Sequence, residues 1–201
     1  MEAKKGRREM KKFELTTEFI TNAFGKKLFR IKALVEFGDV KAGELGGYVE
    51  KEGNVSQAGN AWVYGNARVS GDARVSGNAW VYGNAWVSGN ARVYGDARVY
   101  GNAEVSGNAE VYGDARVCGN AWVYGNADYA LVQGFGTEFR CTTFYRGKNK
   151  KIMVNCGCFH GDLEGFRKQV KETRNGKIAK EYLMIADLME YHFTSEDSSD
   201  E

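Results

Sequence analysis

The 201-residue sequence contains no proline, although it contains 26 glycines, and it has only two histidines. No run of apolar residues approaches the roughly 20 that are needed to cross a bilayer. The basic first residues are followed by the alternating segment KFELTTEFI, where a signal sequence would have an apolar core. We therefore expect a cytoplasmic protein without membrane contact. In that setting the four cysteines are expected to be reduced thiols.

The chain also lacks a strong net charge, with a formal value of +2. Residues 1–12 carry six Lys or Arg and two Glu, whereas residues 194–201 carry four acidic side chains and no basic one. These ends are typical of a basic and an acidic flexible tail. Between them, residues 59–128 hold five Arg against two Glu and four Asp. A phosphate backbone requires a basic stripe, so a nucleic-acid partner is not expected.

The excess of glycine comes from a repeat. A glycine occurs at every sixth residue from Gly53 to Gly125, thirteen times in succession, and from Gly59 each unit reads G-[ND]-A-x-V-[YSC]. A six-residue period is too short for helical repeats and is typical of a β-helix in which each unit forms one short strand and one corner. Ala and Val lie two residues apart and point to the same side, so they are predicted to form the core. Gly and Asn or Asp tolerate the positive φ that a corner requires.

Three units make an 18-residue coil, and the outward residues favour this period. The residue after Val repeats its identity more often at a spacing of 18 than at 6 or 12. We therefore predict a mainly β protein with a three-sided β-helix of about four coils over residues 53–130. Alternation in residues 13–37 predicts a β-hairpin, and residues 13–52 as a whole predict a cap over the open sheet edge.

Residues 131–193 predict a small α/β domain. FRCTTFYR and KIMVNCGCFHG alternate about the turn GKNK, which indicates a second hairpin. Asp162 is a plausible N-cap for a first helix, and Asn175-Gly176 are expected to supply its C-cap and turn. The last helix, KIAKEYLMIADLMEYHF, is apolar over more than half of its circumference. One side is therefore expected to meet the hairpin and the other a second subunit, giving a homo-oligomer.

Two segments resemble known proteins. The junction DVKAGELGGYVE followed by GNAWVYGNA resembles a group of bacterial and phage β-helix proteins, some of them described as acyltransferases or polymer-forming proteins. The tail, with TTFYRG, VNCGCFHG, LEGF and EYLMIADLMEYHF, resembles a small α/β domain of phage and prophage proteins. The resemblance covers most of the chain and implies a left-handed β-helix, an α/β appendage and a phage or prophage origin. Neither group supplies functional residues that match positions here.

An acyltransferase is one function that the resemblance suggests. Such enzymes resemble one another in having a catalytic histidine near a coil and often an inserted loop, whereas these repeats contain neither. The two histidines, His160 and His192, have no evident nucleophile or acid partner in the sequence. We therefore assign no catalytic residue.

A metal site is a second alternative. If Cys156, Cys158 and His160 lie on one strand, they share a face, and Cys141 on the partner strand could supply a fourth ligand for zinc. The C-x-C spacing differs from the usual zinc knuckle, and small buried side chains in a core strand give the same alternation. The core-strand interpretation is the default, so no metal or other cofactor is expected.

The outward residues of one face offer a third possibility, and with 18-residue coils they form two columns. These residues are Trp62, Tyr64, Trp80, Tyr82, Arg98, Tyr100 and Arg116. Stacked aromatic residues stabilise a solenoid by themselves, but Trp, Tyr and Arg also dominate protein interfaces. Both interpretations stay open. We predict a phage-type, non-catalytic module that binds a host protein through this face and inhibits a host enzyme or defence complex, with an acyltransferase or a polymer-forming protein as alternatives.

Overall fold

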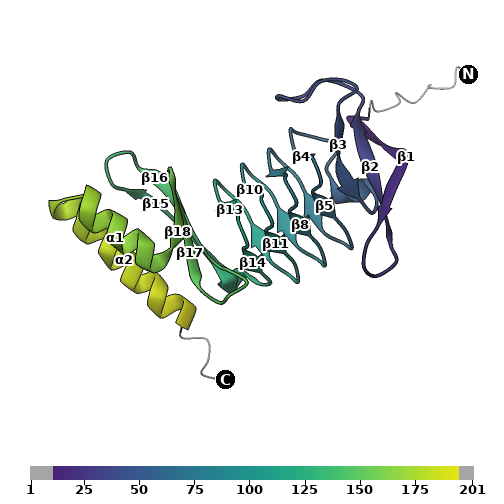
Figure 1. Ribbon diagram of the computed structural model, residues 1–201. Helices are drawn as coiled ribbons and strands as arrows, with labels where there is room; N and C mark the ends of the chain where they lie inside the picture. The colour runs from purple at the N-terminus through teal and green to yellow at the C-terminus, as the bar shows by residue number, and fades with distance from the viewer. Residues whose placement is uncertain (1–10, 195–201) are drawn as a thin grey trace, which may run out of the picture.

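The computed structural model describes residues 11–194 and consists of a solenoid with one sheet-containing cap at each end (Figure 1). The expected tails fall almost entirely outside the described residues. Of the first tail only Lys11 and Lys12 are described, and the side chain of Lys12 is buried. Of the second, only Thr194 is described. No helix within residues 11–194 is long and apolar enough to cross a membrane.

The solenoid has three faces, each a parallel sheet whose neighbouring strands are 18 residues apart. The first face consists of β4 (Trp62–Val63), β7 (Trp80–Val81), β10 (Arg98–Val99) and β13 (Arg116–Val117). The second face contains β5 (Arg68–Val69), β8 (Trp86–Val87), β11 (Glu104–Val105) and β14 (Trp122–Val123). The third contains β6 (Arg74–Val75), β9 (Arg92–Val93) and β12 (Glu110–Val111). This arrangement confirms the predicted three-sided β-helix of about four coils.

The core of the solenoid is formed by the Ala and Val of each unit, as predicted. From Ala61 to Val123 these side chains are 0% exposed. The corner glycines from Gly59 to Gly119 have positive φ, for example +66° at Gly77. Beside several corners, asparagine side chains of successive coils are hydrogen-bonded, as in the 3.1 Å contact from Asn60 Nδ2 to Asn78 Oδ1. Alternation and corner chemistry therefore produce both the buried interior and a polar edge.

Hydrogen bonds between coils run in one direction, so they leave carbonyls unpaired in the first coil and N–H groups unpaired in the last coil. The N–H of an outward residue donates to a carbonyl of the following coil, as from Trp80 N to Ala97 O at 2.9 Å. Carbonyls of the first coil therefore have no preceding coil to donate to them. Lys12 Nζ donates to Gly59 O at 3.2 Å and to Ala61 O at 2.8 Å instead.

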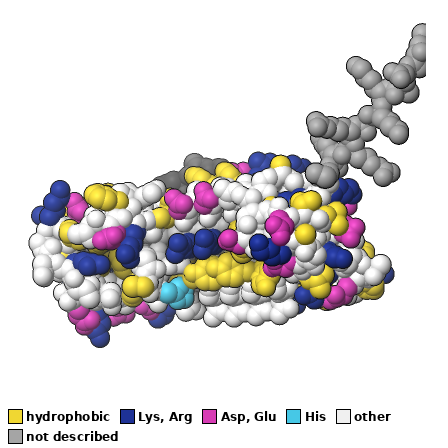
Figure 2. Space-filling view, turned by 90° about the horizontal axis from the view of Figure 1, so that it is seen from above, with side chains coloured by type: hydrophobic (Ala, Val, Ile, Leu, Met, Phe, Trp, Pro, Cys, Tyr) yellow, Lys and Arg dark blue, Asp and Glu magenta, His cyan; other side chains and the backbone are white. Residues whose placement is uncertain are grey.

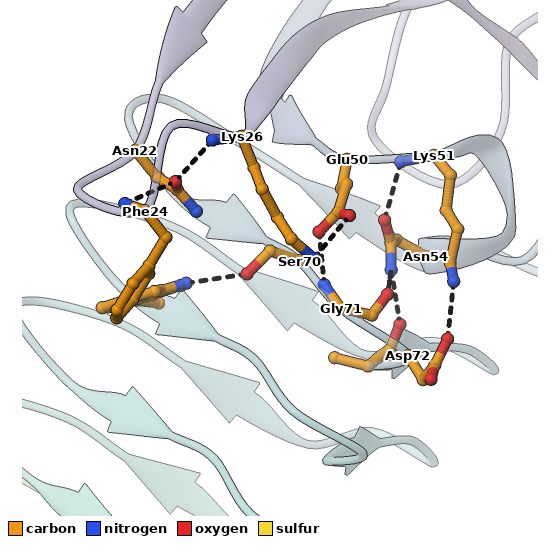
Figure 3. A network of polar contacts seen from close by, with 11 residues as sticks. Asn22, Phe24, Lys26, Glu50, Lys51, Asn54, Ser70, Gly71 and Asp72 are labelled. Atoms are coloured by element: carbon orange, nitrogen blue, oxygen red, sulfur yellow. Dashed lines mark hydrogen bonds and ion pairs between the residues drawn. The ribbon is translucent and has the colours of Figure 1, made fainter.

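The carbonyls at another corner of the first coil are bonded by Asn54 (Figure 3). Its Nδ2 donates to Gly71 O and Ala73 O, and its Oδ1 accepts from the backbone N–H of Lys51. Glu50 accepts from the N–H of Gly71 at 2.7 Å, which fastens the cap to the same corner. These side chains, together with backbone N–H groups of the cap such as those of Tyr48 and Glu50, replace the coil that is missing at this end.

The N-terminal cap is an extension of the second face. A hairpin of β1 (Phe13–Thr21) and β2 (Lys27–Ala33) is followed by β3 (Leu45–Val49) and the short 3-10 helix η1 (Glu52–Asn54). Strand β3 pairs antiparallel with β2 and parallel with β5, so one seven-stranded sheet runs from the cap through the second face. The hairpin agrees with the alternation of the sequence. Strand β3 was not expected, because its sequence LGGYV resembles a glycine-rich link.

The C-terminal cap begins with the 3-10 helix η2 (Asn126–Asp128) and continues in a four-stranded antiparallel sheet. Its elements are β15 (Tyr129–Phe135), β16 (Arg140–Arg146), β17 (Ile152–Cys156), β18 (Phe159–Asp162), α1 (Leu163–Thr173) and α2 (Gly176–Thr194). Both helices pack on this sheet (Figure 1). Asp162 is the predicted N-cap, accepting from Gly165 N. The expectation for Asn175-Gly176 is wrong, because Arg174 is the C-cap of α1 and Gly176 is already the first residue of α2.

Side-chain acceptors close the last coil, where N–H groups have no following coil. Arg116 N donates to Thr143 Oγ1 at 3.0 Å, and Glu110 N donates to Asn126 Oδ1 at 2.7 Å. Tyr124 N donates to Asp128 Oδ2 at 2.8 Å. The first end is therefore closed by donors from side chains and from the cap backbone, and the last by side-chain acceptors.

Candidate functional site

The first face carries a band of hydrophobic side chains with Lys or Arg side chains beside it (Figure 2). Two columns of outward residues form this surface. One column runs through Trp80, Arg98 and Arg116, whose strands pair in register. The other runs through Tyr64, Tyr82 and Tyr100. The structure thus brings six of the seven predicted binding residues together on an accessible surface.

Trp62 does not belong to that surface, and the expectation that it is exposed is wrong. Its side chain is 0% exposed, because the N-terminal cap covers it. The ring of Phe13 lies 6.0 Å from the Trp62 ring and that of Phe37 lies 5.3 Å away, both edge-on. Gly46 lets the cap approach, since a Cβ there would lie 2.7 Å from the indole. Trp62 is therefore a core residue of the cap junction.

A groove of about 420 Å³ lies where the cap meets the first face. Its residues come from the loop between β2 and β3, from one corner and from both columns. They are Gly38, Asp39, Asn60, Tyr64, Asn78, Trp80, Tyr82, Asp96 and Arg98. The corner residues could have been found from the sequence, because Asn60, Asn78 and Asp96 are 18 residues apart. Asp39 could not, since it depends on how the cap folds over the first coil.

The two arginines of the first face are stacked without an acidic neighbour in their column. Arg98 and Arg116 are exposed and directly in register, and no carboxylate of residues 11–194 lies within 4.0 Å of either guanidinium. Like charges directly opposite one another are unfavourable in a sheet. On the third face, by contrast, Arg92 lies in register with Glu110 and forms an ion pair of 3.3 Å. The first face therefore keeps two guanidinium groups available to a ligand.

Two members of the tyrosine column, Tyr82 and Tyr100, are half-buried and stacked. The rings of Tyr82 and Tyr100 are stacked at 4.9 Å with an interplanar angle of 1°. Burial raises the pKa of Tyr82, and burial together with the hydrogen bond to Cys118 raises the pKa of Tyr100 to about 12. Like any phenol with a pKa of about 10 or higher, both are protonated near pH 7 and can donate as well as accept hydrogen bonds.

At its far end the tyrosine column joins the C-terminal cap through a buried polar network. Asn155 Nδ2 donates to Tyr100 Oη at 3.2 Å and contacts Cys118 Sγ at 3.5 Å. Tyr145 Oη lies 3.3 Å from the same sulfur and 3.1 Å from His160 Nε2. The network locks the cap to the last coil. It also gives His160 a phenol partner, which the sequence did not reveal, but the Cys118 thiol is only 3% exposed and therefore poorly accessible to a substrate.

The cysteine motif does not lie on one strand, so that expectation is wrong. Strand β17 ends at Cys156, and the chain reverses at Gly157, whose φ is +61°, before β18 begins at Phe159. Cys158 is exposed in the turn, which also contradicts its assignment to a core strand. Within residues 11–194 no three His, Cys, Asp or Glu side chains are grouped closely enough to hold a metal ion. The reversal explains why Cys156, Cys158 and His160 do not share a face.

Comparison with known proteins matches one family model to part of the solenoid. Residues 61–76, 73–89, 85–101 and 91–107 match the family model described as YdcK Beta solenoid repeat. The matched segments lie within the three faces of the solenoid. No curated protein matches the chain. The matches and the fold together support a repeat β-helix protein.

Proposed function

We propose that the chain is a non-catalytic, phage-type binding module whose first face recognises a host protein in the bacterial cytoplasm. The observation that carries this proposal is the first-face groove, where the partly buried Trp80 and the exposed Arg98 lie beside tyrosines. Aromatic and Arg side chains of this kind are the usual anchors of protein interfaces. A rigid solenoid holds them in fixed positions, so little ordering entropy is lost on binding.

The charge distribution favours a protein over a nucleic acid. Asp39 and Asp96 line the same groove as Arg98. Asp114, 18 residues after Asp96, occupies the same corner in the following coil. These carboxylates would repel a phosphate backbone, which requires a continuous basic surface. A protein surface with basic and acidic groups can complement both signs.

The alternatives have weaker support. A polymer-forming solenoid would expose its sheet edges, whereas here both ends are closed by caps. An acyltransferase of the hexapeptide type would be expected to carry a loop inserted between coils and a histidine free to act as a base. The coils from Gly59 to Gly125 run without insertion, and His160 Nε2 is engaged by Tyr145. A rigid surface without such chemistry would act by occupying a host enzyme or defence complex.

The test is capture of a bacterial protein from lysate by the immobilised chain, followed by mass spectrometry. We expect the wild type and Trp122→Ala, which changes a 46% exposed Trp on the second face, to retain the same protein. Trp80→Ala is expected to lose it, because truncation of a central anchor costs about 2 kcal/mol or more, roughly a 30-fold weaker affinity.

A second variant on the same face makes the result decisive. Arg98→Glu reverses an exposed charge and should lose the partner without a loss of thermal stability, because the new carboxylate would lie in register with Arg116. Equal capture by all variants, or no captured protein, would contradict the proposal. In that case, binding of acyl-CoA would favour the acyltransferase, and concentration-dependent self-assembly would favour the polymer-forming protein.

A further inference from the structure

Helix α2 exposes an apolar stripe that the described chain does not cover. Met184 is 62% exposed, Leu188 57% and Tyr191 72%. Their spacing of four and three residues places them in one row along the helix. Large apolar side chains grouped in this way on one helix are unusual for a solvent-facing surface.

The other side of α2 already has its partner. Tyr182, Ile185, Ala186, Met189 and Phe193 are buried against α1 and the four-stranded sheet. The stripe is therefore not the face that holds the helix on its own domain. It is a second apolar face, as the breadth of the apolar pattern in the sequence predicted.

The charges along this row are asymmetric. Lys177 and Lys180 continue the stripe toward the N-terminus of α2, and both are exposed. Lys177 pairs with Glu181 at 3.5 Å, so this end of the row carries a net charge of +1. Beyond the C-terminus, residues 195–201 contain four acidic side chains and no basic one. One end of the row is thus basic, and the chain that continues from the other end is acidic.

From these features we propose that a second copy of the chain covers the stripe, with the two α2 helices antiparallel and a two-fold axis near Leu188. By sequence position, Met184 then lies opposite Tyr191 of the second copy, and the two Leu188 side chains meet. The same arrangement turns the basic end of each helix toward the C-terminal end of the other helix, from which the acidic sequence continues. The interface is isologous, so a single stripe complements itself. It leaves the first face of both copies free for the proposed partner.

The first experiment is sedimentation velocity over a concentration series. Three side chains form an interface near the lower size limit for dimers, so we expect a monomer–dimer equilibrium at roughly tens of micromolar. Leu188→Glu should weaken it at least roughly 30-fold, because two carboxylates would meet at the axis. Phe24→Glu is the matched control, since Phe24 is 77% exposed at the tip of the β1–β2 hairpin. It should leave the equilibrium unchanged.

Cross-linking tests the antiparallel register. With Cys158→Ser as background, because Cys158 is exposed, Leu188→Cys should form a disulfide-linked dimer on mild oxidation. Lys177→Cys should not, since its counterpart lies at the far end of the opposed helix and disulfides need Cα atoms within about 7 Å. A protein that stays monomeric up to about 1 mM, a range well above weak affinities, would overturn the proposal. So would a dimer that Leu188→Glu leaves intact, or equal cross-linking by the two cysteine variants.

Discussion

Lys12 supplies the hydrogen bonds that a preceding coil would otherwise donate to the first face. Its ammonium lies between two carbonyls and 4.7 Å from the centre of the Phe37 ring, and the residue is only 4% exposed. The cation is therefore stabilised by carbonyl oxygens and an aromatic face instead of a carboxylate. Loss of this side chain would leave the oxygen of Ala61 buried and unsatisfied.

We predict that Lys12→Met lowers the free energy of unfolding by about 1–3 kcal/mol, the cost of leaving a buried acceptor without a donor. Urea denaturation at pH 7 measures it. Lys11→Met is the matched control, because Lys11 forms an exposed ion pair with Glu52. Such pairs contribute less than about 1 kcal/mol. Equal losses in the two variants would contradict the capping role of Lys12.

The stability difference between the wild type and Lys12→Met is expected to depend on pH. Burial lowers the pKa of Lys12 to about 8 from its usual 10.5. Between these values the folded protein binds fewer protons at Lys12 than the unfolded chain, so the stability contributed by Lys12 rises with pH. The stability difference between wild type and Lys12→Met should therefore grow from pH 8 to 10.5. A constant difference would mean that the carbonyls hold the pKa near its usual value.

The corner between two strands is the element that repeats, and glycine is required there for two separate reasons. At Gly77, φ is +66° and a Cβ would lie 3.1 Å from the backbone nitrogen and oxygen of Gly95 in the next coil. At Gly113, φ is +63° but no atom lies within 4 Å of the Cβ position. The second position isolates the cost of the backbone conformation from the cost of crowding.

Gly113→Ala is expected to lower the free energy of unfolding by about 1–2 kcal/mol, the penalty of a left-handed backbone with a Cβ. Gly77→Ala should cost more, because neighbouring coils must also move apart. Urea denaturation of the two variants separates the contributions. If the losses are equal, the coils accommodate a methyl group and only φ matters.

The sequence predicts the elements whose chemistry is local and repeated, and it fails where distant segments meet. Alternation and glycine spacing determine the coils, their faces and the Ala-Val core. The burial of Trp62 depends on Phe13 and Phe37, which approach it from a separate segment. For the same reason the groove residues Trp80 and Arg98 could be predicted, whereas Asp39 could not.

Two further misses come from short strands. Tyr129–Phe135 forms β15, a strand that the sequence analysis does not assign, because pairing with β16 and packing of α2 make it a strand. The reversal at Gly157 interrupts an alternating segment that looks continuous, and Gly157 accepts the positive φ that the turn needs. In both cases pairing with neighbouring strands overrides the local pattern.

For the whole molecule, the interactions that hold each cap are confined to the nearest coils. At the N-terminal end, Phe24 and Lys26 of the cap line one pocket together with Trp86 of the second face. At the C-terminal end, Asn155 bonds to Tyr100, and Lys148 bonds to Glu104. The coils between them repeat one chemistry. The number of units should therefore be adjustable without disturbing either end.

We predict that insertion of one unit, GNARVS, after Ser88 leaves the protein folded. The insertion rotates everything from Gly89 by one face, so Trp80 then neighbours Arg92 in place of Arg98. Circular dichroism should show an unchanged far-UV spectrum and cooperative melting within a few degrees of the wild type, since core positions are retained. Loss of folding would mean that contacts between outward side chains within a column, and not the repeated core, stabilise the solenoid. Retained folding with loss of the captured protein would locate recognition in the column.

Because the first coil is closed by hydrogen-bond donors and the last by acceptors, the solenoid is directional and its two ends are chemically different. Any shortened derivative must keep a donor such as Lys12 or Asn54 at its start and an acceptor such as Thr143 or Asp128 at its end. A fusion that joins two solenoids head to head would bring together groups of the same kind, and their hydrogen bonds would go unmade. A head-to-tail fusion without the intervening caps would match donors to acceptors and extend the stack as one continuous rod.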